Sequence, residues 1–188
     1  MNIKRQTNVL RVFRKIHRLT GIALFVFFFV VAISGILLGW KKHSGGSILP
    51  QTQQGSSARL QDWLPLDSLR RSAEEAILTH LPPGTSTVVD RMDVRPEKGV
   101  VKVRFEGHYW GVQLDGASGK VLQVAPRRSD WLEAVHDGSI VENWLGISGG
   151  YFKLFYTSLL GLALVLFSAT GFWLWYGPKV LRRAKRKR

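Results

Sequence analysis

The residues of this sequence with the widest chemistry are its five histidines, His17, His43, His80, His108 and His136. A neutral imidazole binds metal ions, and it gains or loses a proton near neutral pH. The sequence has no cysteine, which excludes disulfides and covalent haem attachment through C-x-x-C-H. It also lacks H-E-x-x-H, G-x-S-x-G and a phosphate-binding loop. We therefore assign no catalytic residue and no metal site, and the histidines are the remaining candidates.

The distribution of charge predicts which elements position these histidines. All 13 acidic residues lie between Asp62 and Glu142, and both ends of the chain are purely basic. Residues 41–150 are neutral on balance, so the net charge of +14 comes from the tails 1–18 and 177–188 together with Lys153. Lys/Arg-rich flanks stay in the cytoplasm, whereas a neutral loop can cross a membrane. The sequence thus predicts two cytoplasmic ends and an exterior centre.

Two uncharged apolar runs lie next to the basic tails. Residues 19–40 and the apolar part of residues 151–176 would each extend about 33–35 Å as a helix. This length matches a hydrocarbon core of about 30 Å. The first run is too long and too aromatic for a cleaved signal, whose apolar core has about 7–15 residues. We therefore predict a two-pass protein of the bacterial inner membrane, with basic tails that bind anionic lipid and not nucleic acid.

The central part is predicted to be a linker, a small domain and a joint. Residues 41–62 are polar and glycine-rich, typical of a flexible linker. Residues 63–128 predict an α+β domain with one helix, N-capped by Asp67, and four strands. Residues 129–150 predict an interfacial helix and a glycine-rich joint. The predicted strands are Val88–Val94, Gly99–Phe105, Tyr109–Leu114 and Lys120–Val124.

Several motifs resemble PepSY-associated transmembrane proteins. The first span resembles theirs in His17-Arg18-Leu19-Thr20-Gly21, Ser34-Gly35 and Trp40. Asp115-Gly116-Ala117-Ser118-Gly119 resembles the closing hairpin of a PepSY domain. Val135-His136-Asp137-Gly138 and Thr170-Gly171-Phe172-Trp173 resemble the end of that architecture. The resemblance implies a transmembrane helical hairpin with an inserted, extracytoplasmic PepSY-like α+β domain.

The resemblance also implies a range of functions. PepSY modules have been described as inhibitory or chaperone-like domains for secreted peptidases. Larger family members include inner-membrane ferric-siderophore reductases that carry haem between histidines. This chain has only two predicted spans, and hence fewer histidines to ligate haem than those larger members. A redox function would therefore make it a subunit of a reductase and not a self-sufficient reductase.

The candidate ligands for haem b are His17 and His136, which lie in family motifs, and His43, which matches no motif but falls on the same outer side as His136. A bis-His site needs two nitrogens about 4 Å apart. The 22 residues of the first span separate its two ends by about 33 Å, so His17 and His136 cannot share one haem within a chain. His43 could pair with His136, and His17 with a second copy or a partner protein. The alternative is that His17 is an interfacial polar residue and that His136 orders the outer joint by hydrogen bonding.

Three functions remain open at this point. The preferred one is an accessory or binding module whose PepSY-like domain docks a partner protein in the periplasm or inner membrane, with iron uptake as its setting by resemblance alone. The second is a haem b redox subunit, for example a homodimer, that passes electrons to ferric siderophores. The third is a regulator of a secreted or membrane peptidase.

Overall fold

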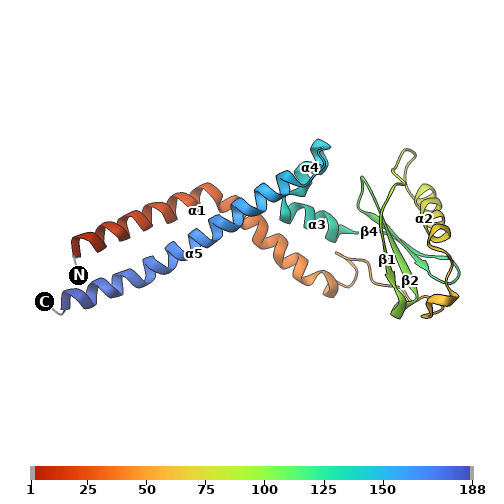
Figure 1. Cartoon of the computed structure of the whole chain (residues 1–188), viewed down its shortest axis with the longest axis horizontal. Coiled ribbons are helices and arrows are strands. Elements are labelled where there is room, and N and C mark those ends of the chain that lie inside the picture. Colours follow the sequence, from red (N-terminus) through yellow and green to blue (C-terminus); the bar gives the residue numbers. More distant parts are fainter. Residues whose placement is uncertain (1–2, 187–188) are drawn as a thin grey trace. The chain divides into compact units, whose positions relative to one another are not determined.

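The computed structural model describes residues 3–186, without the side chains of residues 3, 4, 184 and 185. The chain divides into two compact units. Met1–Gly35 and Val135–Arg188 form one, here called the helical unit, and Ile36–Ala134 form the other, the sheet unit. Figure 1 shows the long helices of the first and the sheet with its covering helix in the second.

Two long helices dominate the helical unit. Helix α1 is Ile3–Trp40 and helix α5 is Tyr151–Arg186. They run antiparallel, because Phe13 meets Trp173 with ring centroids 6.1 Å apart and Phe27 meets Tyr156 at 6.2 Å. Figure 1 shows α1 in red to orange and α5 in blue. Both helices continue beyond the predicted spans into the basic tails, since Lys and Arg are good helix formers.

Both helices are long and apolar enough to cross a membrane. Only 6% of the most apolar stretch of α1 and 17% of that of α5 are buried within the chain. A core helix of a soluble protein would bury most of this surface, because exposed apolar area is costly in water. These two helices therefore support a membrane protein, and they flank an α+β region as the sequence predicts.

The sheet unit is built on a four-stranded antiparallel sheet in the order β1-β2-β3-β4. The strands are β1 Val89–Arg95, β2 Val100–Phe105, β3 Trp110–Asp115 and β4 Val121–Pro126. Each lies within two residues of its predicted bounds, because alternating apolar and polar residues mark a half-buried strand. The short 3-10 helix η3, Pro96–Lys98, connects β1 to β2.

Helix α2, Leu66–His80, covers one face of this sheet (Figure 1). Its buried residues pack against the inward side chains of β2 and β3, and each fully buried Val or Leu contributes about 1.5–3 kcal/mol. This core contains Leu69, Ala73, Ala76, Ile77, Val101, Val103, Phe105, Val112 and Leu114. The predicted N-cap is wrong. Pro65 occupies that position, and Asp67 lies inside the first turn, where it pairs with Arg70 at 2.8 Å and Arg71 at 2.7 Å.

The polar segment 41–62, which precedes α2, is attached to the sheet. It contains the 3-10 helices η1, Lys41–His43, and η2, Leu60–Asp62. The backbone N–H of Gln53 donates to Gln113 Oε1 at 3.0 Å, and that of Gly55 donates to the Lys98 carbonyl at 2.8 Å. The Ser56 hydroxyl donates to Asp115 at 2.7 Å. The segment is thus an anchored strap, and not the free linker that its composition predicts.

Two short helices precede α5. Helix α3 is Arg128–Asp137 and helix α4 is Ser139–Leu145. Gly138 separates them with φ of +81°, a conformation that favours glycine. A Cβ at this position would also lie 2.7 Å from the Tyr156 ring. The predicted interfacial helix is therefore followed by a turn, as expected, and then by a further helix that the sequence did not reveal.

Candidate functional site

His17 of α1 forms a hydrogen bond with α5. Its Nδ1 lies 2.9 Å from the hydroxyl oxygen of Thr170. The imidazole stacks on Phe167, with ring centroids 3.9 Å apart and planes inclined by 24°. Thr170 is only 2% exposed. The ring is thus fixed in position by one hydrogen bond and one stacked aromatic face.

His136, in the last turn of α3, forms the equivalent bond with α1. Its Nδ1 lies 2.9 Å from the hydroxyl oxygen of Ser34. Ser34 is 4% exposed and lies in the C-terminal part of α1. These two residues are 102 positions apart in the sequence, so only the tertiary fold brings them together.

The two sites repeat one local pattern. In each, a glycine follows the hydroxyl residue, and a Cβ on Gly35 or Gly171 would lie 3.4 Å from Cε1 and 3.9 Å from Nδ1 of the facing histidine. Each imidazole therefore lies against bare helix backbone beside its hydroxyl partner. A residue larger than alanine would displace the ring.

The hydroxyl groups determine which ring nitrogen carries the proton. Ser34 donates its proton to the Val30 carbonyl at 2.7 Å, and Thr170 donates to the Leu166 carbonyl at 2.8 Å. A hydroxyl has a single proton, so with that proton on the carbonyl its oxygen is left to accept from Nδ1–H of the histidine. The neutral imidazole then carries its lone pair on Nε2, the tautomer that an Nε2 metal ligand requires.

The two histidines are far apart. His17 and the Ser34 partner of His136 are separated by 17 positions of α1, about 25 Å along the helix axis at 1.5 Å per residue. Two ligands of one iron lie about 4 Å apart. His17 and His136 therefore belong to two separate levels of the helical unit.

The other histidines lie in the sheet unit. His43, the third candidate ligand, is exposed in η1, and its pairing with His136 stays a prediction. His80 is exposed at the end of α2, with Nδ1 2.9 Å from the Ala76 carbonyl oxygen. His108 is half-buried, stacks on Phe105 and lies 3.0 Å from the Ser86 carbonyl oxygen.

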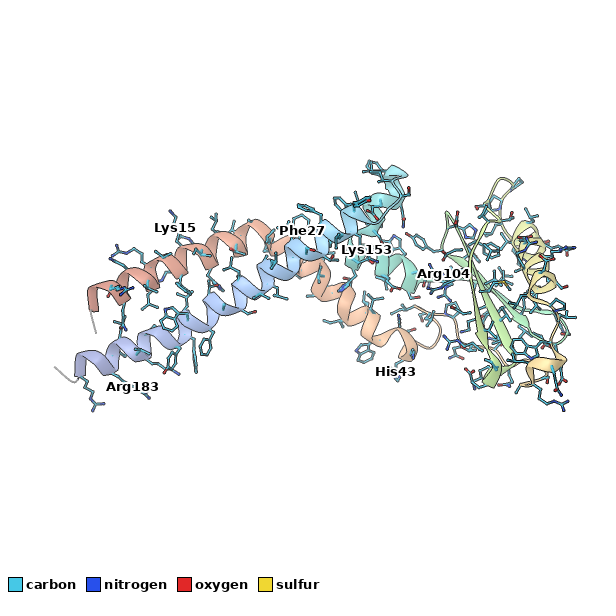
Figure 2. All side chains as sticks on the ribbon, viewed as in Figure 1. Lys15, Phe27, His43, Arg104, Lys153 and Arg183 are labelled. Atoms are coloured by element: carbon cyan, nitrogen blue, oxygen red, sulfur yellow. The ribbon has the colours of Figure 1, made fainter. Side chains whose placement is uncertain are left out.

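Two acids hold the joint around His136. Asp137 forms an ion pair with Lys153 in the first turn of α5, whose side chain is labelled in Figure 2. Burial raises the pKa of Asp137, but hydrogen bonds from Lys153 and Ser139 outweigh it and leave the pKa below its ordinary value. Glu142, 6% exposed, accepts the backbone N–H of Phe152 at 2.7 Å. These carboxylates cap and fasten helices, and they do not form a paired acid–base site.

An apolar groove lies between α1 and α5 near the His17–Thr170 pair. Its volume is about 440 Å³. Thr20 is the only polar residue in its lining. Leu166, which also lines the groove, precedes Thr170 by four residues and so lies on the same face of α5. Its lining comprises Leu19, Thr20, Ala23, Leu24, Leu159, Leu162, Ala163 and Leu166.

Comparison with known families decides the classification of this architecture. The family model of the PepSY-associated TM region matches residues 2–188. The chain belongs to this family. The resemblance found in the sequence is thereby confirmed over nearly the full length. No curated protein matches the chain significantly.

For this family member, the structure adds two residues that the sequence argument missed. Ser34 and Thr170 lie in two of the family motifs, but the sequence assigned no role to their hydroxyls. Each hydroxyl donates to a carbonyl of its own helix and also lies 2.9 Å from Nδ1 of a candidate histidine. The available signal was the repeated hydroxyl–glycine pair, Ser34-Gly35 and Thr170-Gly171, one on each span.

Proposed function

We propose that this protein is a membrane-anchored subunit that holds haem b at two levels, through Nε2 of His17 and Nε2 of His136. The observation that carries the proposal is the pair of Nδ1-to-hydroxyl hydrogen bonds. Histidines that ligate a metal almost always donate their other ring N–H to a neighbouring acceptor, which fixes the ring and its tautomer. Neither Nε2 has a hydrogen-bond partner among the described residues.

The donor set fits haem better than a bare metal ion. No group of three or more His, Cys, Asp or Glu gathers as a metal site within residues 3–186. Haem brings four of its own nitrogens and needs only axial ligands, of which histidine is a common one. The apolar groove beside the His17 level suits an apolar macrocycle. When bound, haem would supply one-electron redox chemistry.

His17 would need a second imidazole from outside the chain, and so would His136 if its predicted pairing with His43 does not form. A two-fold homodimer supplies it economically, because the same residue of each copy then faces its equivalent across the axis. His17 would pair with His17 and His136 with His136. A different membrane subunit could supply the second imidazole in the same way.

The chain's own residues would position the group. Thr170 and Ser34 hold the rings in the Nε2 lone-pair form, Phe167 supports the His17 ring, and Asp137 and Glu142 fix the joint that carries His136. The basic tails favour a cytoplasmic location for both ends by the positive-inside rule. The two levels would then lie toward opposite faces of the bacterial inner membrane.

The accessory role expected from the sequence is the second candidate. It is favoured by the sheet unit, which has its own core and is fastened by its strap. Such a unit could dock a partner outside the membrane. Iron uptake and peptidase regulation depend on the family resemblance alone.

Absorption spectroscopy of the purified protein tests the haem proposal. The full chain, expressed with ample haem and purified in mild detergent, should show a Soret band and reducible α and β bands. A symmetric dimer with one haem at each level holds about one haem per chain. His17→Ala and His136→Ala should each remove about half of it, and the double variant nearly all.

His80→Ala is the matched control, because His80 is an exposed histidine outside the helical unit. It should leave the spectrum unchanged. A folded, colourless preparation would refute the haem proposal and favour the accessory role. Haem that persists in the double variant would refute the assigned ligands.

A further inference from the structure

The sheet unit contains a pocket of about 440 Å³, separate from both histidine levels. This volume lies within the range of about 300–1,000 Å³ typical of small-molecule sites. One wall is the strap, including Thr52, and the other is the β1–β2 end of the sheet. The strap is held there by the bond from Gly55 N–H to the Lys98 carbonyl.

The lining of this pocket is strongly cationic. Lys42, Arg95, Lys98 and Lys102 line it, against a single acid, Glu97. None of these four cations forms an ion pair within residues 3–186. By contrast, Arg104, labelled in Figure 2, and Arg127 of the same unit both contact Asp130.

Lys102 is the least exposed of the four. It lies in the middle of β2, opposite Asp93 on β1 and Gln113 on β3. Its ammonium donates to the Thr52 hydroxyl at 2.5 Å and has no carboxylate partner. Burial, together with the charges of Arg127 and Arg95, lowers the pKa of Lys102. Lys102 is half-buried and forms no ion pair with a described residue, so a bound anion would offset the cost of desolvating its ammonium.

We propose that this pocket binds a small anion that carries carboxylate or phosphate groups. Lys102 would contact the anion at the inner end, and the guanidinium of Arg95 would bind it in the bidentate geometry that planar oxyanions favour. Lys42 and Lys98 add charge at the rim. The site is independent of haem.

Two sources could provide such an anion. One is a soluble carboxylate or phosphate compound outside the membrane. The other is the phosphate of a lipid headgroup, since Lys42 follows the last residue of α1 by only two positions. Both share the chemistry that the pocket recognises, and the membrane composition distinguishes them.

Calorimetric titration of the full chain in nanodiscs tests the proposal. With phosphatidylcholine alone, citrate and inorganic phosphate serve as probes. Arg95→Gln and Lys102→Gln should each raise the Kd for citrate about tenfold or more, because each removes a charge-assisted hydrogen bond. If phosphatidylglycerol in the disc suppresses the citrate signal, the headgroup is the occupant. An unchanged signal assigns a soluble anion.

Lys120→Gln is the control, because Lys120 is an exposed cation of the same unit outside the pocket. It should retain the parent affinity. Lys98→Gln, an exposed substitution that leaves the sheet intact, should weaken binding even if Lys102→Gln perturbs folding. The proposal is overturned if neither citrate nor inorganic phosphate binds in phosphatidylcholine discs, or if Lys120→Gln weakens citrate binding as much as the pocket variants.

Discussion

The Thr170–His17 hydrogen bond can be measured as a coupling energy in a double-mutant cycle. Thr170→Val keeps the size of the side chain and removes the hydroxyl that lies 2.9 Å from His17 Nδ1. Interhelical hydrogen bonds in membrane proteins average about 0.6 kcal/mol and reach about 1.7 kcal/mol. Thr170 is 2% exposed and the ring is stacked on Phe167, so we expect a coupling in the upper half of that range.

Thr157 provides a close control on the same helix. Its hydroxyl donates to the Lys153 carbonyl at 2.7 Å, as that of Thr170 donates to Leu166 at 2.8 Å, but it is exposed and meets no histidine. Thr157→Val therefore loses the same bond to the backbone without the bond to His17. The difference between the two variants isolates the histidine contact.

The assay is reversible unfolding of the full chain in mixed micelles, followed by near-ultraviolet circular dichroism. Thr170→Val, His17→Ala and the double variant complete the cycle. A coupling of zero would refute the bond as described. So would a Thr157→Val variant as destabilised as Thr170→Val.

Three further predictions concern the rest of the chain. Burial raises the pKa of Asp115, but hydrogen bonds from Ser56 and Ser118 outweigh burial and leave the pKa below its ordinary value. The ionised carboxylate therefore stabilises the fold at pH values above its ordinary pKa of about 3.9. This stabilisation is lost as the pH falls through the lowered pKa of the folded state. Asp115→Asn should cost about 1–3 kcal/mol near neutral pH and reduce the loss of stability on acidification, which an unchanged acid titration would contradict. Gly116→Ala should destabilise the sheet unit by about 1–3 kcal/mol, because a Cβ there would lie 2.3 Å from the Trp63 ring. Gly161→Ala is the control and should leave the protein's stability unchanged, because no atom lies within 4 Å of a Cβ at that position. Equal melting temperatures of the two variants would exclude the clash. Reporter fusions should place residue 188 in the cytoplasm and residue 90 outside, and the same location for both would contradict the charge argument.

Local patterns in the sequence predicted most of the sheet unit. The alternation of Val101, Val103 and Phe105 with Lys102 and Arg104 marked β2 because a strand on a one-sided core has period two. This periodicity did not predict the strap, residues 41–62. Its bonds to Gln113 and Asp115 join residues about 60 positions apart, and its polar, glycine-rich composition is equally typical of a free linker.

The candidate site was only half visible in the sequence. His17 and His136 could be singled out by type and by family motif, but their partners depend on how α1 meets α5 and α3. No local rule pairs Ser34 with a residue 102 positions away. Hydroxyls in apolar helices commonly bond their own backbone, so nothing in the sequence indicated a second bond. Ser34 and Thr170 each form one, with a histidine.

Nitrogen-15 NMR of the full chain, labelled at histidine and prepared without haem, tests the central claim most directly. The chemical shifts of the two ring nitrogens identify which one carries the proton. The account predicts a proton on Nδ1 and a lone pair on Nε2 for both His17 and His136, with the signals altered by Thr170→Val and Ser34→Ala respectively. A proton on Nε2 of both rings in the unmodified protein would contradict it.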